Sequence, residues 1–282
     1  MTNKGSLTIV GSGIQAVRQF TLEASQSIEQ ADKVLYSVVD PITEMWIKKT
    51  NSNTESLADY YIDGKHRRDI YQTITERILY YVKKGLNVCV IFYGHPGVFV
   101  DSSYESIRLA RQEGFSASML PGISAEDCLF SDLNIDPSIG CQSFEATGFL
   151  VRKRKFDTSS HLILWQIGVI GEFIHKDTAD YSKHGLTVLV DYLKHYYDAD
   201  HEVVVYQAAQ YAIYKPIIQR VLLSNLHEAQ INVFSTLYVP PKGQAPLDYG
   251  MVDRLGLLSE LKEVNSNPFI NKLFRFTHKN KK

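Results

Sequence analysis

Short apolar segments alternate with helix-patterned segments through the first half of the chain, and glycine or proline turns separate them. A repeated strand and helix is typical of a mostly parallel, doubly wound α/β sheet. By periodicity and turn signals, the predicted strands are 7–10, 34–39, 87–92 and 116–120, and the predicted helices are 17–28, 66–84, 103–112 and one that starts after residue 122.

The composition turns to proline, glycine and serine near residues 136–141, where we expect a domain boundary. The later segments predict a smaller, mixed α/β domain and then a short helix with a basic tail. The expected strands there are 143–147, 161–166, 203–206 and 232–239, with helices at 185–197, 220–229 and 252–264. We therefore expect an N-terminal domain at 1–138, a C-terminal domain at 139–241 and a helical tail at 242–282.

Composition excludes several classes of protein. Hydrophobic residues make up 44% and charged residues 22%, which is typical of a globular chain. A net charge of −1 argues against non-specific nucleic-acid binding. Three cysteines at wide spacings indicate neither a disulfide framework nor a zinc cluster. No apolar run approaches the roughly 20 residues of a membrane span, and no secretory signal is recognised. We expect a cytoplasmic protein without a catalytic metal.

The first glycine turn allows two interpretations. Gly11-Ser12-Gly13-Ile14-Gln15-Ala16 fits G-x-G-x-x-A after a strand, and Asp40 ends the second predicted strand, as the ribose-binding acid of a dinucleotide site would. Glycines at such a turn also serve close packing. The turn alone therefore leaves an NAD-dependent oxidoreductase open as an alternative.

Two later turns favour a ligand site more strongly. Tyr93-Gly94-His95-Pro96-Gly97-Val98-Phe99 directly follows a buried predicted strand, at the carboxyl edge where open α/β sheets place ligands. Pro121-Gly122-Ile123-Ser124-Ala125 follows the next predicted strand and opens a helix, whose first N–H groups are free to bind. Together the two turns favour small-molecule binding over turn formation.

These three turns, in this order and on these elements, resemble the tetrapyrrole methylase fold group, and most closely the borosin peptide backbone α-N-methyltransferases. The resemblance covers about residues 6–241. It implies two α/β domains with an S-adenosylmethionine cleft between them. Tetrapyrrole methylases usually carry Gly-Asp-Pro where this chain has Gly94-His95-Pro96, and that departure argues against a corrin or porphyrin substrate. A tetrapyrrole or other small-molecule methyltransferase remains an alternative.

The resemblance also implies which residues contact the cofactor. In the second domain the matching strings are shorter than in the first. The implied contacts are Tyr93, His95, Val98, Phe99, Ser124, Ala125, Gln166, Tyr206, Ala208, Ser235 and Thr236.

A catalytic pair is expected on the helix predicted at 66–84. Arg67 and Tyr71 are four residues apart, so they lie on one helical face. From spacing alone, a surface arginine stacked on a tyrosine is the favoured interpretation. The resemblance implies an active site in this region instead, with Asp59, Tyr60, Tyr61 and Gly64 leading into it.

Amide methylation explains why these residue types would be used. The amide proton must leave, and negative charge must be stabilised on the carbonyl oxygen. A guanidinium stays charged and suits an oxyanion. A nearby arginine lowers the pKa of a tyrosine and favours it as general base. We hypothesise that Tyr71 or a neighbouring tyrosine takes the proton, that Arg67 stabilises the oxyanion and that Tyr93 orients the reactants.

The resemblance implies partners as well. Some borosin enzymes carry their substrate as an apolar C-terminal extension, whereas this chain continues past Phe276 as a polar, basic tail. We therefore expect a precursor peptide supplied in trans, in a heteromeric complex with the enzyme. A homodimer is expected, with residues 59–81 near a shared substrate channel.

Overall fold

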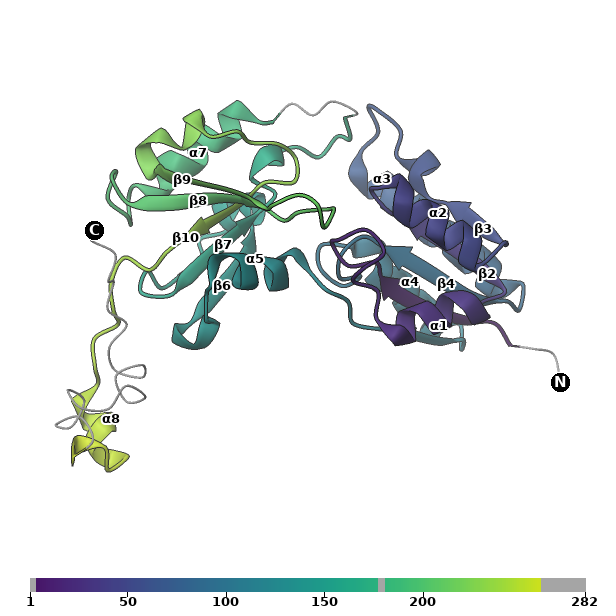
Figure 1. The fold of residues 1–282 in the computed structure, drawn as a ribbon, viewed down its shortest axis with the longest axis horizontal. Coiled ribbons are helices and arrows are strands. Elements are labelled where there is room, and N and C mark those ends of the chain that lie inside the picture. Colours follow the sequence, from purple (N-terminus) through teal and green to yellow (C-terminus); the bar gives the residue numbers. More distant parts are fainter. Residues whose placement is uncertain (1–3, 177–180, 260–282) are drawn as a thin grey trace.

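The computed structural model describes residues 4–176 and 181–259, which form two five-stranded sheets set side by side (Figure 1). The first sheet is entirely parallel, in the order β3-β2-β4-β1-β5. Its elements are β1 (Ser6–Gly11), α1 (Leu22–Gln30), β2 (Lys33–Ser37), α2 (Pro41–Thr50), β3 (Thr54–Ser56), α3 (Arg67–Lys83), β4 (Asn87–Phe92), α4 (Asp101–Gln112) and β5 (Ser116–Met119).

Strict alternation of apolar side chains lets helices cover both faces of this sheet. From β4, Val88, Val90 and Phe92 pack with the apolar residues of α3 and α4, whereas Cys89 and Ile91 pack with those of α1 and α2. β1 and β4 lie side by side, yet the helices that follow them cover opposite faces. Their carboxyl ends therefore form the topological switch point at which such sheets bind ligands.

The second sheet is mixed, in the order β6-β7-β10-β8-β9. Only the β6–β7 pair is parallel, and the other neighbours are antiparallel. A core around Phe149, Leu189 and Tyr197 fills the face covered by α6 and α7. The elements are α5 (Ala125–Leu133), β6 (Cys141–Glu145), α6 (Ala146–Val151), β7 (His161–Trp165), α7 (Lys183–Leu193), β8 (Glu202–Gln207), β9 (Ile217–Leu222), β10 (Thr236–Val239) and α8 (Tyr249–Arg254), with short 3-10 turns at Ala58–Tyr60, Pro137–Ile139, Ile167–Val169 and Leu223–Glu228.

The other face of the second sheet joins the two halves of the molecule. Leu129 of α5 packs there against Ile163 and Val204, and Ile14 and Tyr93 from the first half join the same cluster. The two sheets are therefore connected by an apolar interface as well as by the chain between β5 and α5. This arrangement of two α/β units confirms the predicted fold class.

Several predicted elements were wrong in type or extent. Residues 217–222 form β9 followed by a 3-10 turn, not the helix predicted at 220–229, because pairing with β8 outweighs the helical spacing of the leucines. β10 starts only at Thr236, and α1 only at Leu22, after the N-cap Thr21. Both α2 and β3 were missed.

The chain beyond β10 extends away from the second sheet and carries α8 (Figure 1). The predicted helix at 252–264 corresponds in part to α8, and the predicted basic tail lies outside the described residues. Within 4–176 and 181–259, no helix is both long and apolar enough to cross a membrane.

Candidate functional site

The glycine turn after β1 and the loop after β4 interlock at the switch point. The amides of Gly13 and Gly94 bond to each other's carbonyl oxygens, at 3.3 and 3.0 Å. A Cβ at Gly11 would collide with the carbonyl oxygen of Gly94, so only glycine permits this approach. The early glycines therefore have a packing role that does not depend on any ligand.

His95 acts locally within its loop. Its Nδ1 accepts a hydrogen bond from the Gly97 amide at 2.9 Å, and its carbonyl oxygen accepts one from the Val98 amide at 3.1 Å. Beyond this turn, Phe99 has a positive φ of 58° and its ring lies 5.9 Å from that of Trp165 on β7. Through Phe99, the loop reaches from the first half to the second.

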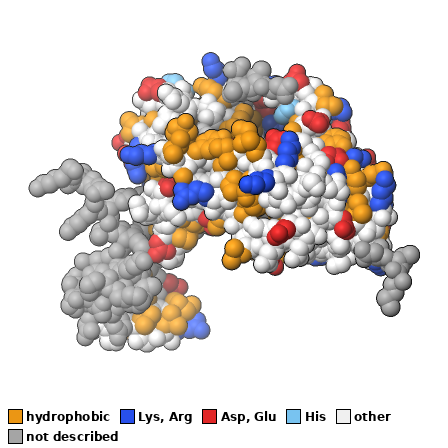
Figure 2. All heavy atoms as spheres, turned by 45° about the vertical axis from the view of Figure 1, so that its right-hand side comes forward, with side chains coloured by type: hydrophobic (Ala, Val, Ile, Leu, Met, Phe, Trp, Pro, Cys, Tyr) orange, Lys and Arg blue, Asp and Glu red, His pale blue; other side chains and the backbone are white. Residues whose placement is uncertain are grey.

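A recess opens between the two halves, beside this loop. Its lining residues share one property, which is that none of them carries a charge. They are Tyr93, Ala125, Tyr206, Gln207, Ala208, Gln210, Phe234 and Thr236. On the face shown in Figure 2, hydrophobic side chains gather in a band beside a hollow in the surface.

The structure brings five of the residues implied as cofactor contacts into this recess, namely Tyr93, Ala125, Tyr206, Ala208 and Thr236. Sequence reasoning missed Gln207, Gln210 and Phe234. The first two flank Ala208 at the end of β8, and Phe234 lies two residues before Thr236, so inspecting the neighbours of the implied residues would have found them.

Polar contacts hold two tyrosines of the recess in place. Burial raises the pKa of Tyr93 to about 12, although a hydrogen bond with Gln210 lowers it in part. The carbonyl oxygen of Gln210 also accepts from the Ala16 amide at 2.8 Å, which ties the loop after β8 to the first glycine turn. The hydroxyl of Tyr206 donates a hydrogen bond to Asp132 at 2.7 Å. Burial is the main reason why the pKa of Tyr206 is raised, and the Asp132 carboxylate raises it further. Both phenols are therefore protonated at neutral pH.

The other implied cofactor residues do not line the recess; they are His95, Val98, Phe99, Ser124, Gln166 and Ser235. The hydroxyl of Ser124 caps α5 by exchanging hydrogen bonds with Asp127. The hydroxyl of Ser235 accepts from the Asn232 amide at 3.0 Å. Gln166 adopts the left-handed backbone region directly after β7. Ser124 and Ser235 thus shape the turns that carry Ala125 and Thr236.

Arg67 and Tyr71 lie at the start of α3, next to Tyr61. We call these three residues the Arg67 group. Burial raises the pKa of Tyr71, and neighbouring Arg67 offsets this only in part. Burial likewise raises the pKa of Tyr61, and the charge interaction with Tyr71 raises it further. The expectation that the arginine would lower the net pKa of Tyr71 was therefore wrong, because desolvation of the phenolate outweighs the attraction.

The Arg67 group does not line the recess, but Ser37 connects the two. Ser37 ends β2, and its side chain lies close enough to the hydroxyl of Tyr61 to lower the pKa of that tyrosine in part. The carbonyl oxygen of Ser37 accepts a hydrogen bond from the Tyr93 amide at 3.0 Å. Within the described part of the chain, the guanidinium of Arg67 forms no ion pair or hydrogen bond. It is a cation without a carboxylate partner near the carboxyl ends of β2 and β4.

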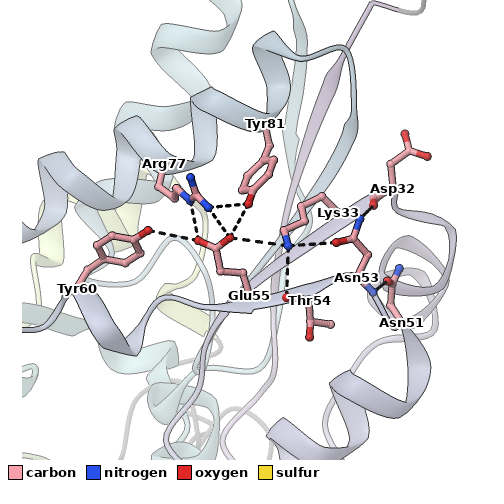
Figure 3. Close-up of polar contacts among 9 residues, drawn as sticks. All are labelled: Asp32, Lys33, Asn51, Asn53, Thr54, Glu55, Tyr60, Arg77 and Tyr81. Atoms are coloured by element: carbon pink, nitrogen blue, oxygen red, sulfur yellow. Dashed lines mark hydrogen bonds and ion pairs between the residues drawn. The ribbon is translucent and has the colours of Figure 1, made fainter.

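A second arginine and tyrosine pair on α3 has a different environment (Figure 3). Arg77 donates to both carboxylate oxygens of Glu55 at 2.7 and 2.9 Å, and Tyr81 donates to Glu55 at 2.6 Å. Bonding to Arg77 lowers the pKa of Glu55 to about 2. With Lys33 and Tyr60, which also contact Glu55, these residues form the Glu55 cluster. It fastens the edge strand β3 to α3.

The acid proposed for a dinucleotide site has another role. Asp40 is buried and its carboxylate accepts the Thr43 amide at 2.8 Å as the N-cap of α2. The helix begins at Pro41, in the first-turn position that proline favours. The oxidoreductase interpretation thus loses the free acidic residue on which it depended.

The chain matches a protein family described as Tetrapyrrole (Corrin/Porphyrin) Methylases over residues 6–215. It is 46% identical to a protein from Gymnopus fusipes named as a methyltransferase and ribosomally synthesized cyclic peptide gymnopeptides precursor, over 90% of this chain and 62% of the relative. It is 45% identical to the omphalotin A precursor methyltransferase of Omphalotus olearius, over 91% and 63%. The chain thus spans less than two thirds of these relatives.

Solved structures agree in fold. Uroporphyrin-III-C-methyltransferase from Thermus thermophilus superposes with a TM-score of 0.61 at 15% identity, covering 88% of this chain and 99% of that one. Cobalt precorrin-4 methyltransferase gives a TM-score of 0.61 at 18% identity, covering 83% and 94%.

Proposed function

The chain belongs to the tetrapyrrole (corrin/porphyrin) methylase family, and on this basis we propose that it is an S-adenosylmethionine-dependent α-N-methyltransferase of peptide backbone amides. The observation that carries the proposal is Arg67, whose guanidinium has no ion pair or hydrogen bond among the described residues. It is set beside two partly buried tyrosines and linked through Ser37 to the uncharged recess. The names of the relatives, which join a methyltransferase to a ribosomal peptide precursor, support a peptide substrate.

The recess suits this cofactor chemically. When bound, S-adenosylmethionine supplies an electrophilic methyl group on a positively charged sulfur. Tyr93, Tyr206 and Phe234 offer aromatic surfaces that attract a cation, and no lysine or arginine in the lining repels one. Gln207, Gln210 and Thr236 add amide and hydroxyl groups that can fix its polar ends. We assign the recess to the cofactor, with His95, Val98, Phe99, Ser124, Gln166 and Ser235 shaping its walls.

The Arg67 group is assigned to the amide. Arg67 holds the carbonyl oxygen, on which negative charge develops as the nitrogen loses its proton, because a guanidinium remains charged and donates in a planar fork. Tyr71 or its neighbour Tyr61 takes that proton, and the nitrogen then forms its bond to the methyl carbon as the carbon–sulfur bond breaks. Since burial raises the pKa of both phenols, the proton-accepting phenolate is the minor form at neutral pH.

The partners are part of the same proposal. The peptide reaches the site in trans, in a heteromeric complex, and the enzyme is a cytoplasmic homodimer with residues 59–81 near the substrate channel. Hydrophobic side chains on the segment carrying α8 support self-association, since Tyr249 is 66% and Leu255 64% exposed. Sedimentation of the purified chain alone tests the homodimer, and sedimentation with a separate peptide tests the heteromeric complex.

Ligand-induced stabilisation and mass spectrometry test the activity. S-adenosylhomocysteine should raise the melting temperature and NAD should not, because only a ligand of the folded state stabilises it. With S-adenosylmethionine and a separate apolar peptide, fragmentation should show mass increments of one methylene group on backbone nitrogens. Stabilisation by NAD, or methylation of a tetrapyrrole instead of the peptide, would refute the proposal.

A further inference from the structure

A short segment of the second half pairs with residues 64–67, where α3 begins. We call Phe173–His175 the strap. The Arg67 amide donates to Phe173 O at 2.9 Å, the His175 amide donates to Lys65 O at 2.8 Å, and the Gly64 amide donates to His175 O at 3.0 Å. His66 and Ile174 face each other in an antiparallel bridge. The strap thus joins the two halves through an isolated antiparallel β-bridge.

Ring contacts accompany these backbone hydrogen bonds. The ring of Phe173 lies parallel to that of His66 at 6.2 Å, and the ring of His175 meets Tyr61 edge-on at 5.6 Å. Phe173 remains 60% exposed and Ile174 41%. Since Phe173 and Ile174 are largely exposed, the amides that cross between the halves contribute to holding the strap in position.

At its base, the strap is connected to the wall of the recess. It follows the 3-10 turn at Ile167–Val169, where a Cβ at Gly168 would collide with the carbonyl oxygen of Asn232. The side chain of Asn232 in turn donates to Gln207, a lining residue of the recess, at 2.8 Å. Packing therefore links the base of the strap to the proposed cofactor site.

At its other end, the strap fixes the first turn of α3. The first amides of a helix have no partner within it. That of Arg67 is satisfied by Phe173 O, and that of Arg68 by Nδ1 of His66 at 3.2 Å. Tyr61, whose pKa responds to Tyr71 and Arg67, touches the strap through His175.

We propose that the strap is a positioning element, which sets Arg67 and Tyr61 relative to the cofactor recess. This inference rests on the proposed function. Because the strap contacts Tyr61 and the backbone of Arg67 but does not line the recess, its loss should slow the methyl-transfer step while leaving cofactor binding intact. A displacement of a catalytic group by about 1 Å can cost roughly 100-fold in rate.

The test compares two proline substitutions in adjacent residues. His175→Pro removes the N–H that donates to Lys65 together with the ring that meets Tyr61, whereas Ile174→Pro removes an N–H that has no partner within the described residues. His175→Ala, which removes the ring and keeps the N–H, should retain most of the rate and so separates the two losses. His175→Pro should lower kcat by about 30-fold or more, and Ile174→Pro by less than about threefold. Both variants should bind S-adenosylhomocysteine within about twofold of the unmodified chain, which also reports that they are folded.

Hydrogen exchange gives a readout that does not depend on turnover. In His175→Pro the Arg67 amide should exchange at least about tenfold faster, and in Ile174→Pro it should remain protected. Equal exchange and equal kcat in the two variants would overturn the inference. If the unmodified chain methylated no peptide, the proposed function would fail, and the exchange comparison would still decide whether the strap positions Arg67.

Discussion

Helix α3 carries two arginine and tyrosine pairs with the same spacing, and their surroundings differ. Arg77 and Tyr81 share the carboxylate of Glu55, and the guanidinium lies 4.6 Å from the tyrosine ring centre. Arg67 and Tyr71 have no such carboxylate between them, and no stacking joins them in the described part of the chain. The stacked arginine that spacing alone favours for Arg67 is thus found at Arg77.

The comparison shows that spacing places two side chains on one face but does not decide their role. The groups opposite the helix decide it. Where Glu55 lies across from α3, the arginine and tyrosine are satisfied and hold an edge strand. Where Tyr61 and Tyr71 lie beside it, the guanidinium of Arg67 has no carboxylate partner among the described residues, and we propose that it binds a substrate oxygen. Variants of the two pairs should therefore separate catalysis from stability.

Replacing each arginine should give the largest effects. Arg67→Ala should slow methylation by about 100-fold or more, because the developing oxyanion loses its charged donor, while the free energy of unfolding changes little. Arg77→Ala should lower the free energy of unfolding by about 2 kcal/mol, as it leaves a half-buried carboxylate without its main partner. Initial rates measure the methylation activity of both variants, and urea unfolding measures their free energies of unfolding. If Arg77→Ala lost as much activity as Arg67→Ala while staying folded, the contrast would be wrong.

The proposed base predicts a dependence on pH. Because burial raises the pKa of Tyr71, the phenolate increases about tenfold per pH unit below that pKa. In the unmodified chain kcat should therefore rise from about pH 7 to pH 9. Tyr71→Phe should be much slower and should lose this slope, whereas Tyr81→Phe should keep it. A Tyr71→Phe profile as steep as that of the unmodified chain would point to Tyr61 as the base.

The Glu55 cluster should make stability depend on acidic pH. The carboxyl has its pKa lowered from 4.5 to about 2 in the folded state, so its stabilisation is complete above 4.5 and is lost as pH falls towards 2. At pH 7, Glu55→Gln should lower the free energy of unfolding by about 2 kcal/mol. The difference from the unmodified chain should shrink below about pH 4. A difference that did not vary with pH would mean that the charge of Glu55 contributes nothing.

The smallest expected effect concerns the tyrosine hydroxyls. Tyr81→Phe removes the hydrogen bond to Glu55 and should cost about 1 kcal/mol of unfolding free energy, without changing the methylation rate. Tyr71→Phe should leave the stability nearly unchanged, since its hydroxyl has no hydrogen-bond partner within the described residues. Thermal unfolding of the two variants in parallel would measure this difference in stability. Equal destabilisation would remove the distinction between the pairs.

Local patterns predicted most strands and helices because those elements bury alternating or periodic apolar residues. β4 was predicted from Asn87 to Phe92, as observed. α2 was missed because Asp40 was interpreted as the end of a strand, although aspartate at the N-cap followed by proline is also a helix start. Residues 220–222 of β9 were predicted as part of a helix because the partner strand β8 lies ten or more residues away in the sequence and leaves no mark in the local spacing.

The candidate site was predictable only in part. Tyr93 and Ala125 follow strands of the first sheet, so the topology itself points to them. Gln210 and Phe234 reach the recess through loops of the second half, and no local pattern marks such residues. The strap and the pairing of Arg77 with Glu55 could not be predicted either, because they depend on contacts between residues far apart in the sequence. The rise in the pKa of Tyr71 could not be foreseen either, because it depends on burial.

A crystal structure with S-adenosylhomocysteine and a substrate peptide tests the central claim most directly. The account predicts the cofactor product in the recess between Tyr93, Tyr206 and Phe234, with a peptide carbonyl oxygen against the guanidinium of Arg67 and a phenol of the Arg67 group near the amide nitrogen. A product bound elsewhere, or Arg67 and Tyr71 directed away from the peptide, would contradict it.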